Sequence, residues 1–241
     1  MTSALALRPL SARSVVLSLL LGAHPAELAA SALVRAGELF DVPETTLRAA
    51  LSRMVAAGDL VRDGSTHGLS ERLLERQRRQ DVALHADTVG WDGTWEQVVI
   101  TGSGRTAQAR AELRATLSSL RLAELREGVW LRPANLARAL PTWPDGLIST
   151  LRSTPDEGPV VLARRLWDVD GWASHGQALL DGLTSAGTAR DRLTVSAAVV
   201  RHLLVDPVLP RELLPRGWPS ERLREAYARY SAELIAQTLR A

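Results

Sequence analysis

The most informative segment of this chain reads Thr45-Thr46-Leu47-Arg48-Ala49-Ala50-Leu51-Ser52-Arg53-Met54-Val55-Ala56-Ala57-Gly58. At about 100° per residue, its larger apolar side chains fall on one side of a helical wheel, as in a helix packed on a core. Gly58 ends the predicted helix, because glycine readily adopts the left-handed conformation found after a last helical turn. The opposite side carries small, hydroxyl and arginine side chains: Thr45, Arg48, Ala49 and Ser52, flanked by Thr46 and Arg53. This division is typical of a recognition helix in a helix-turn-helix.

The preceding residues predict the other helix of such a motif. Residues 32–40 place apolar side chains at three- and four-residue spacing, as an amphipathic helix requires. Asp41-Val42-Pro43-Glu44 then interrupts the pattern. We expect Asp41 to cap the recognition helix, with Glu44 completing a capping box and Pro43 tolerated in the first turn.

The apolar run at residues 15–21 predicts a further helix, buried at the start of the domain. A signal peptide is the alternative, because Arg8 and Arg13 precede the run and small residues follow it. No segment approaches the roughly 20 apolar residues of a membrane span. We therefore expect no membrane association.

A strand, a turn and a second strand follow the recognition helix, in the position of a wing. Residues 59–62 and 68–70 are the expected strands, and the wing offers only Arg62 and His67 for phosphate contacts. Arginine can bind guanine through two hydrogen bonds, and Thr or Ser can reach a base edge. The candidate DNA-binding residues are therefore Thr45, Thr46, Arg48, Ala49, Ser52, Arg53, Arg62 and His67. The alternative is an ordinary helical domain with solvated arginines.

The composition excludes several kinds of enzyme. All 29 basic residues are arginine, and the chain has no lysine and no cysteine. Schiff-base lysines, P-loop lysines, thiol nucleophiles and cysteine zinc sites are therefore excluded. The net charge of +2 lies wholly in residues 1–80, which hold ten arginines and eight acidic residues. This small excess points weakly to an anionic partner of that segment.

A glycine-rich loop supports a rival enzyme hypothesis. Gly102-Ser103-Gly104-Arg105-Thr106-Ala107 has the G-x-G-x-x-A form of a dinucleotide fingerprint, between a predicted strand at 95–100 and a predicted helix at 106–120. The next predicted strand, at 128–132, ends in Arg132, where an NAD site prefers an acidic residue. No further βαβ units follow. The alternative is a turn in a small α+β domain, and a phosphate of another ligand could also bind there.

The rest of the chain shows no metal or catalytic site. The charged segment 71–80 predicts a linker helix, and three segments with apolar stripes, 172–186, 188–205 and 220–240, predict long helices. Packing in a core is the favoured interpretation of these stripes, and a dimer interface is the alternative. All seven tryptophans lie beyond residue 90. Most fit core positions, and a pocket for a flat ligand is the alternative for some.

Together, several segments resemble the PaaX-type regulators, the phenylacetic acid catabolism repressors. They keep the family order and cover nearly the whole chain. The last of them, the D-P-x-L-P-x-E-L-L-P…W-P run, is the most specific. The segments are 45–53 with Gly58, Trp91-Asp92-Gly93-Thr94-Trp95, Gly128-Val129-Trp130-Leu131-Arg132-Pro133, Leu166-Trp167-Asp168-Val169-Asp170, and 206–215 followed by Trp218-Pro219.

The resemblance implies a mostly helical α+β chain. Its expected domains are a winged helix-turn-helix with a linker helix at 1–85, a ferredoxin-like domain similar to the Cas2 fold at 86–165, and a helical domain at 166–241. It implies a cytoplasmic, dimeric repressor of a catabolic operon, not an enzyme and without a cofactor. Such a repressor binds a double-stranded DNA operator and releases it when an acyl- or aryl-CoA thioester, or another small molecule, binds.

The candidate effector contacts are Trp95, Arg105, Trp130 and Arg132. Two other functions stay open. One is a nicotinamide-dinucleotide enzyme that uses the loop at 102–107. The other is a protein-interaction module whose winged helix does not bind DNA, since the predicted wing carries little positive charge.

Overall fold

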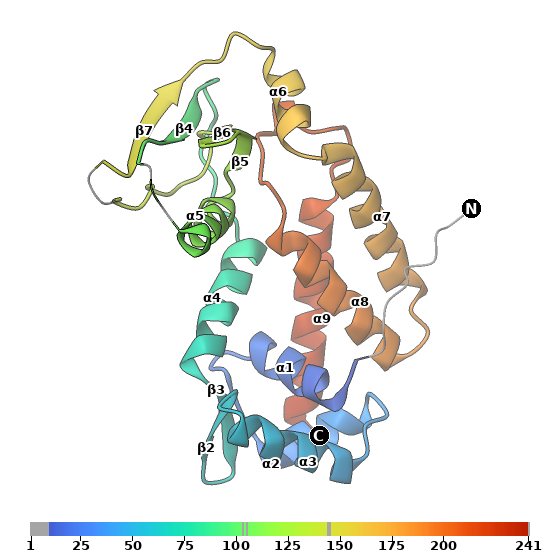
Figure 1. The fold of residues 1–241 in the computed structure, drawn as a ribbon. Coiled ribbons are helices and arrows are strands. Elements are labelled where there is room, and N and C mark those ends of the chain that lie inside the picture. Colours follow the sequence, from blue (N-terminus) through green and yellow to red (C-terminus); the bar gives the residue numbers. More distant parts are fainter. Residues whose placement is uncertain (1–9, 103, 105, 144–145, 241) are drawn as a thin grey trace. The chain divides into compact units, whose positions relative to one another are not determined.

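The computed structural model describes residues 10–102, 104, 106–143 and 146–240. The chain divides into two compact units (Figure 1). Unit 1 comprises Met1–His85, Ser174–Leu204 and Pro219–Ala241, and unit 2 comprises Ala86–Ala173 and Val205–Trp218. One division between the units falls between residues 85 and 86. Residues 166–241, for which the sequence predicts a C-terminal domain, contribute to both units.

The N-terminal part of unit 1 is a winged helix. The second and third helices have the order and spacing of a helix-turn-helix. They accompany a three-stranded antiparallel sheet of order β1-β3-β2, with β1 before the second helix and β2 and β3 after the third. The strand β1 was not predicted from the sequence, because a three-residue strand carries almost no periodic signal. The elements are α1 (Ala12–Gly22), β1 (Glu27–Ala29), α2 (Ala30–Glu38), α3 (Glu44–Ala56), β2 (Leu60–Asp63) and β3 (Thr66–Leu69).

The turn between α2 and α3 differs from the predicted capping box. The residue that caps α3 is Pro43, and no side chain accepts a hydrogen bond from the first helical amides. Asp41 adopts a left-handed conformation with φ 57°, and its amide closes the preceding turn onto the Glu38 carbonyl at 3.1 Å. The prediction that Asp41 caps the helix is therefore wrong. Packing sets this turn, since Phe40 and Val42 on either side of Asp41 are buried.

The remaining helices of unit 1 complete the core of the winged helix. One cluster of buried residues combines Val16 and Leu20 of α1 and Leu47 of α3 with Leu193 and Leu234 near the C-terminus. This shared core explains why the C-terminal helices belong to the same unit as the winged helix. The elements are α4 (Glu71–Leu84), α7 (Val169–Ser185), whose first residues belong to unit 2, α8 (Ala189–Leu204) and α9 (Ser220–Arg240). None of the described helices has the length and apolar character that crossing a bilayer would need.

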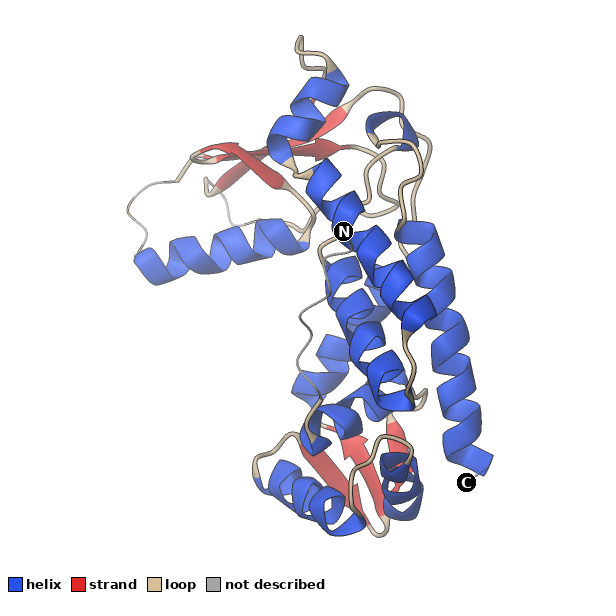
Figure 2. Cartoon of the chain, turned by 90° about the vertical axis from the view of Figure 1, so that its right-hand side faces the viewer, coloured by secondary structure: helices blue, strands red, loops and turns tan. Residues whose placement is uncertain are grey.

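Unit 2 contains a ferredoxin-like antiparallel sheet of order β5-β6-β4-β7 (Figure 2). The helix α5 connects the two strands β4 and β5, which are not neighbours in the sheet, and β5 and β6 form a hairpin. The described residues between β6 and β7 contain no helix. The elements are β4 (Trp95–Ile100), α5 (Ala107–Ser119), β5 (Ala123–Arg126), β6 (Val129–Pro133), β7 (Ile148–Ser153), α6 (Pro159–Leu166) and the 3-10 helix η1 (Arg211–Leu213).

This sheet does not have the arrangement of a dinucleotide-binding fold. The strand β4, which precedes the glycine-rich loop, pairs antiparallel with both of its neighbours. The dinucleotide fingerprint belongs to a parallel βαβ unit. In the loop, Gly104 has a φ of 78°, a left-handed conformation that suits a turn, while Ser103 and Arg105 lie outside the described residues. The sequence match to the fingerprint therefore marks a strand-to-helix turn.

Gly176 allows α7 to pack closely within unit 1. A Cβ added there would lie 2.7 Å from Pro219 Cγ and 3.2 Å from Leu223 Cδ1. We expect Gly176→Ala to lower the free energy of unfolding by about 1–3 kcal/mol, the typical result of overpacking. Gly187→Ala is the control, because nothing lies within 4 Å of its added Cβ. Urea denaturation followed by far-UV circular dichroism measures both, and equal stability of the two variants would contradict the close packing.

Candidate nucleic-acid interface

The recognition helix α3 presents the two sides that its sequence predicts. Leu47, Ala50, Leu51 and Met54 are buried, and all four are at most 3% exposed. The structure brings together six of the candidate DNA-binding residues on one exposed side of this helix. They are Thr45, Thr46, Arg48, Ala49, Ser52 and Arg53.

The two arginines of this exposed side are available to a new partner. Arg48 Nε donates to Glu44 Oε1 at 2.6 Å, one turn earlier in the same helix. Such an exposed pair contributes little to stability, so exchanging it for a phosphate or a guanine costs little. Arg53 is exposed and forms no ion pair with any described residue. Ala49 between them has only a methyl group, which permits close approach to the floor of a groove.

The wing contributes one of its two predicted residues. Arg62 on β2 is exposed, and its Nε donates to the Gly64 carbonyl at 2.9 Å in the turn of the hairpin. His67 on β3 is only 6% exposed, and β3 is the central strand of its sheet. Its side chain faces the interior of the domain, which does not favour a contact with DNA, so this contact stays a prediction. Arg62 is the exposed candidate of the wing.

Asp59 fixes the end of the recognition helix, and sequence reasoning did not identify it. Its side chain is buried, and it accepts a hydrogen bond from Arg13 Nη2 of α1 at 2.7 Å and another from Arg72 of α4. Its backbone amide donates to the Met54 carbonyl of α3 at 2.9 Å. The position of α3 is thus tied to α1 and α4. These partners are distant along the chain, so no local pattern could reveal the contact.

Burial of His67 makes unit 1 sensitive to acid. Burial first, and the nearby positive charge of Arg62 second, lower the pKa of His67 from its ordinary value of 6.5. The unfolded chain therefore takes up a proton before the folded chain does as the pH falls. Stability is expected to be lost as the pH drops through 6.5, and the loss stops growing below the folded-state pKa.

We expect His67→Gln to weaken this dependence. Urea denaturation at about pH 7.5 and about pH 5.5, followed by far-UV circular dichroism, gives the stability that each protein loses between the two pH values. The losses of the wild type and of the variant are then compared. The wild type is expected to lose more stability, by at most about 1.4 kcal/mol for each pH unit. Equal losses in the two proteins would show that His67 is not the group responsible.

Three of the candidate effector residues of unit 2 are buried in this fold. Trp95 is 1% exposed and stacks with Trp167 at a ring-centroid distance of 6.5 Å. Trp130 is 3% exposed and packs beneath the guanidinium of Arg114. Arg105 lies outside the described residues. Both rings are covered by protein, which does not favour a contact with an effector, and their role as effector contacts stays a prediction.

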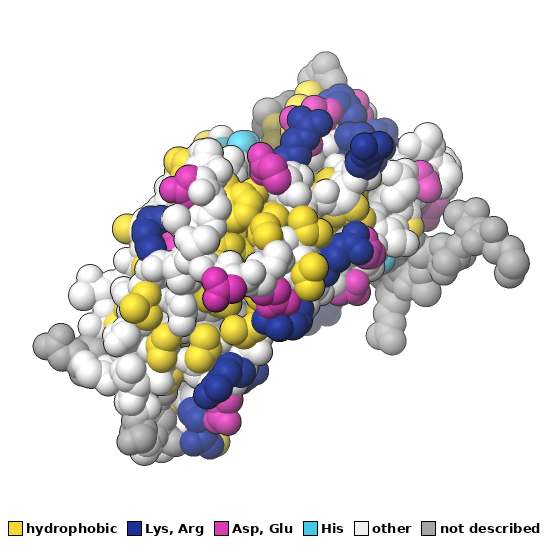
Figure 3. All heavy atoms as spheres, turned by 90° about the horizontal axis from the view of Figure 1, so that it is seen from above, with side chains coloured by type: hydrophobic (Ala, Val, Ile, Leu, Met, Phe, Trp, Pro, Cys, Tyr) yellow, Lys and Arg dark blue, Asp and Glu magenta, His cyan; other side chains and the backbone are white. Residues whose placement is uncertain are grey.

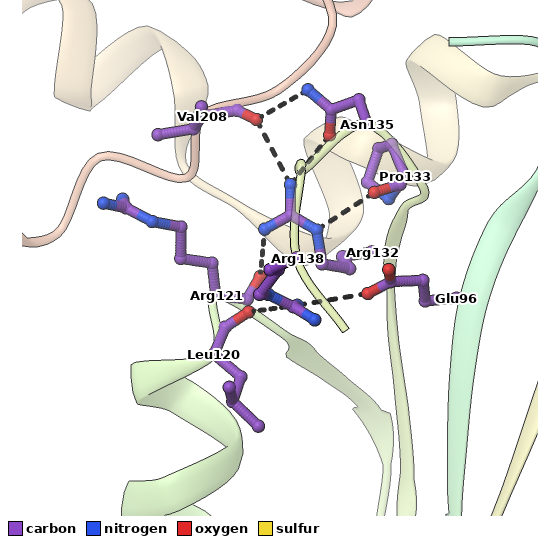
Figure 4. Close-up of polar contacts among 8 residues, drawn as sticks. All are labelled: Glu96, Leu120, Arg121, Arg132, Pro133, Asn135, Arg138 and Val208. Atoms are coloured by element: carbon purple, nitrogen blue, oxygen red, sulfur yellow. Dashed lines mark hydrogen bonds and ion pairs between the residues drawn. The ribbon is translucent and has the colours of Figure 1, made fainter. Parts of the chain in front are cut away.

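Arg132, the last of these candidates, lies at the centre of a buried hydrogen-bond network (Figure 4). Its Nη2 donates to Asn135 Oδ1 at 2.8 Å and to the Val208 carbonyl at 3.2 Å, and its Nε donates to the Pro133 carbonyl at 3.0 Å. Burial lowers the pKa of Arg132 to about 9, so the guanidinium still carries its charge at neutral pH. Asn135 Nδ2 also donates to Val208, at 3.0 Å. The D-P-x-L-P segment is thereby held against the sheet of unit 2.

The electrostatic character of the surface matches the small net charge of +2. On the face drawn in Figure 3, basic and acidic side chains are interspersed around an apolar area and form no field of a single sign. Among the described residues, no group of histidine and carboxylate side chains could hold a metal ion. The exposed side of α3, with Arg62 nearby in sequence on the wing, is therefore the best candidate site for an anionic polymer.

Comparison with protein families gives three matches that follow one another along the chain. Residues 11–73 match the family described as PaaX-like protein, and residues 88–143 match the PaaX protein central Cas2-like domain. Residues 183–240 match the PaaX-like protein C-terminal domain. Comparison with curated proteins gives no match.

Among solved structures, the chain is similar to "Uncharacterized protein Rv0674 from Mycobacterium tuberculosis". The two share 47% sequence identity and superpose with a TM-score of 0.83. The match covers 95% of this chain and 97% of the other. The whole fold, and not only one domain, is therefore shared with that protein.

Proposed function

Because this chain belongs to the PaaX family of proteins, we propose that it is a transcriptional regulator that binds a double-stranded DNA operator through the exposed side of α3. The observation that carries the proposal is the division of α3 between a buried apolar side and an exposed side with Thr45, Arg48, Ser52 and Arg53. In a helix-turn-helix, the second helix enters the major groove and reads base edges. Arginine and hydroxyl side chains are suited to that task.

The low net charge supports a particular mode of binding. A protein with an excess of only two positive charges gains little from bulk attraction to phosphates. Specific contacts and dimerisation then have to supply most of the affinity. We propose a homodimer that presents two α3 helices to half-sites about one helical turn, roughly 34 Å, apart.

The family and the fold support a regulatory role. We propose that the protein represses a catabolic operon in the cytoplasm, and that binding of a small molecule, such as an acyl- or aryl-CoA thioester, releases it from DNA. The position of α3 depends on α1 and α4 through Asp59, Arg13 and Arg72, which supports this role. A ligand that moves those helices would also move the recognition helix. The proposal includes no catalytic activity and no cofactor.

Footprinting of the full-length protein on the DNA upstream of its own gene tests this function. We expect two protected segments about one helical turn apart, and protection that survives an excess of unrelated DNA. Absence of specific protection would contradict the proposal and favour a protein-interaction module. Neither the antiparallel sheet nor the covered tryptophans favour the nicotinamide enzyme.

A further inference from the structure

Unit 1 contains a cavity of about 200 Å³ between helices α1, α4, α8 and α9. Its apolar wall includes Leu17, Leu21, Leu193, Val200 and Leu234. All of the lining residues belong to unit 1. The cavity is therefore a feature of the same compact unit that carries the recognition helix.

The charges around this cavity have a single sign. Its lining includes Arg13, Arg76 and Arg201 and no acidic residue or histidine. Arg76 and Arg201 are exposed, and neither forms an ion pair with a described residue. Arg13 is already bound to Asp59. Two uncompensated guanidinium groups beside an apolar cavity favour an anion with an apolar body.

The lining also contains hydroxyl groups that lack partners. The side-chain oxygens of Tyr230 and Ser196 are buried without a hydrogen-bond partner in the described part of the chain. Both residues line the cavity. Elsewhere in the lining, Gln80 Nε2 donates to the Tyr227 hydroxyl at 3.2 Å. Unsatisfied buried hydroxyls destabilise a fold, so a polar ligand atom or a water molecule at this site would be favourable.

We propose that this cavity binds a compact amphipathic anion, with its apolar body among α1, α8 and α9 and its anionic group at Arg76 and Arg201. An engineered cavity of about 150 Å³ holds benzene, so this one accommodates a ligand a few heavy atoms larger. It lies below the roughly 300 Å³ at which pockets for drug-sized ligands begin, which excludes the nucleotide part of a CoA thioester. As an effector site, the cavity rests on the proposed function, and it differs from the candidates Trp95, Trp130 and Arg132 of unit 2.

Isothermal titration calorimetry with octanoate, on the full-length protein without DNA, tests the proposal. Octanoate has an apolar chain and one carboxylate, and 1-octanol is the matched neutral probe. We expect octanoate to bind with one site per chain and at least about tenfold more tightly than 1-octanol, since charge-assisted hydrogen bonds are the stronger ones. Equal affinity for the two probes would overturn the assignment of an anion.

Variants then test the location. Arg76→Gln with Arg201→Gln is expected to weaken octanoate binding about tenfold, while Arg79→Gln, an exposed change on the same helix α4 that does not line the cavity, leaves it unchanged. Ala197→Trp fills the cavity and is expected to abolish binding. Ser18→Leu is the smaller filling variant if the first does not fold, and circular dichroism checks both. Undiminished binding in a folded filling variant would overturn the location.

The outcome is independent of DNA binding. A wild-type protein that protects its operator but binds no octanoate would overturn this site and leave the proposed function standing. A protein that binds octanoate at the cavity but protects no DNA would overturn the proposed function and leave this site standing.

Discussion

The double variant Arg48→Ala, Arg53→Ala is expected to bind operator DNA about 100-fold more weakly than the wild type and to keep its fold. A good bidentate contact between arginine and a base contributes about 1–3 kcal/mol, so losing two such contacts has an effect of this size. The fold should survive, because both side chains are exposed and the only ion pair they make with a described residue is the weak one between Arg48 and Glu44. Gel-shift titration on the footprinted DNA measures the affinity, and circular dichroism checks the fold.

A matched control separates placed contacts from the simple loss of charge. The double variant Arg222→Ala, Arg229→Ala also removes two positive charges, but from the exposed surface of α9. We expect this variant to bind DNA within about threefold of the wild type at moderate salt, because neither side chain belongs to α3 and salt screens exposed charges that make no direct contact. If the two double variants lose affinity equally, or if the α3 variant loses none, α3 is not the recognition helix.

Arg132→Ala is expected to lower the stability of unit 2 by about 3 kcal/mol, because it leaves buried oxygens without donors. The Pro133 carbonyl and the Asn135 side chain lose their bonds from the guanidinium, and the Val208 carbonyl keeps only the bond from Asn135. The side chain of Arg132 is 0% exposed, so water cannot replace it without rearrangement. Arg132→Lys keeps the charge but supplies fewer donors in a different geometry. Its stability should therefore lie between those of the wild type and of Arg132→Ala.

The tryptophans make this prediction measurable for unit 2 separately. All seven belong to unit 2, so their fluorescence during urea denaturation reports that unit, whereas far-UV circular dichroism reports both. Arg126→Ala, an exposed change on the neighbouring strand β5, is the control and should stay within about 0.5 kcal/mol of the wild type. An Arg132→Ala variant as stable as this control would contradict the structural role of the network.

Elements with a strong local pattern were predicted closely. The strand at Trp95–Ile100 has the predicted limits, and α3 and α9 begin and end within a residue of theirs. These segments combine clear apolar periodicity with glycine or proline at their ends, so local sequence is enough to specify them. The strands β1, β5 and β7 were missed. The strands β1 and β5 are short, and the exposed residues of the edge strand β7 show no alternation that the sequence could reveal.

The candidate site was predicted only in part, because local sequence patterns specify some of its residues and not others. The exposed residues of α3 followed from the helical period alone. Burial of His67, Trp95, Trp130 and Arg132 depends on contacts with strands and loops far along the chain. Asp59 and the cavity of unit 1 depend on such contacts as well. None of these contacts leaves a pattern in neighbouring residues.

Sequence therefore specified the winged helix, its recognition helix and the membership of the family, because these rest on periods, caps and motifs within a few turns of chain. It also excluded lysine and cysteine chemistry outright. Tertiary packing specified which polar residues remain accessible. Burial arises where segments distant in sequence meet, and only there do Arg132 become a structural anchor, His67 an interior residue, and Arg76 and Arg201 the rim of an apolar cavity.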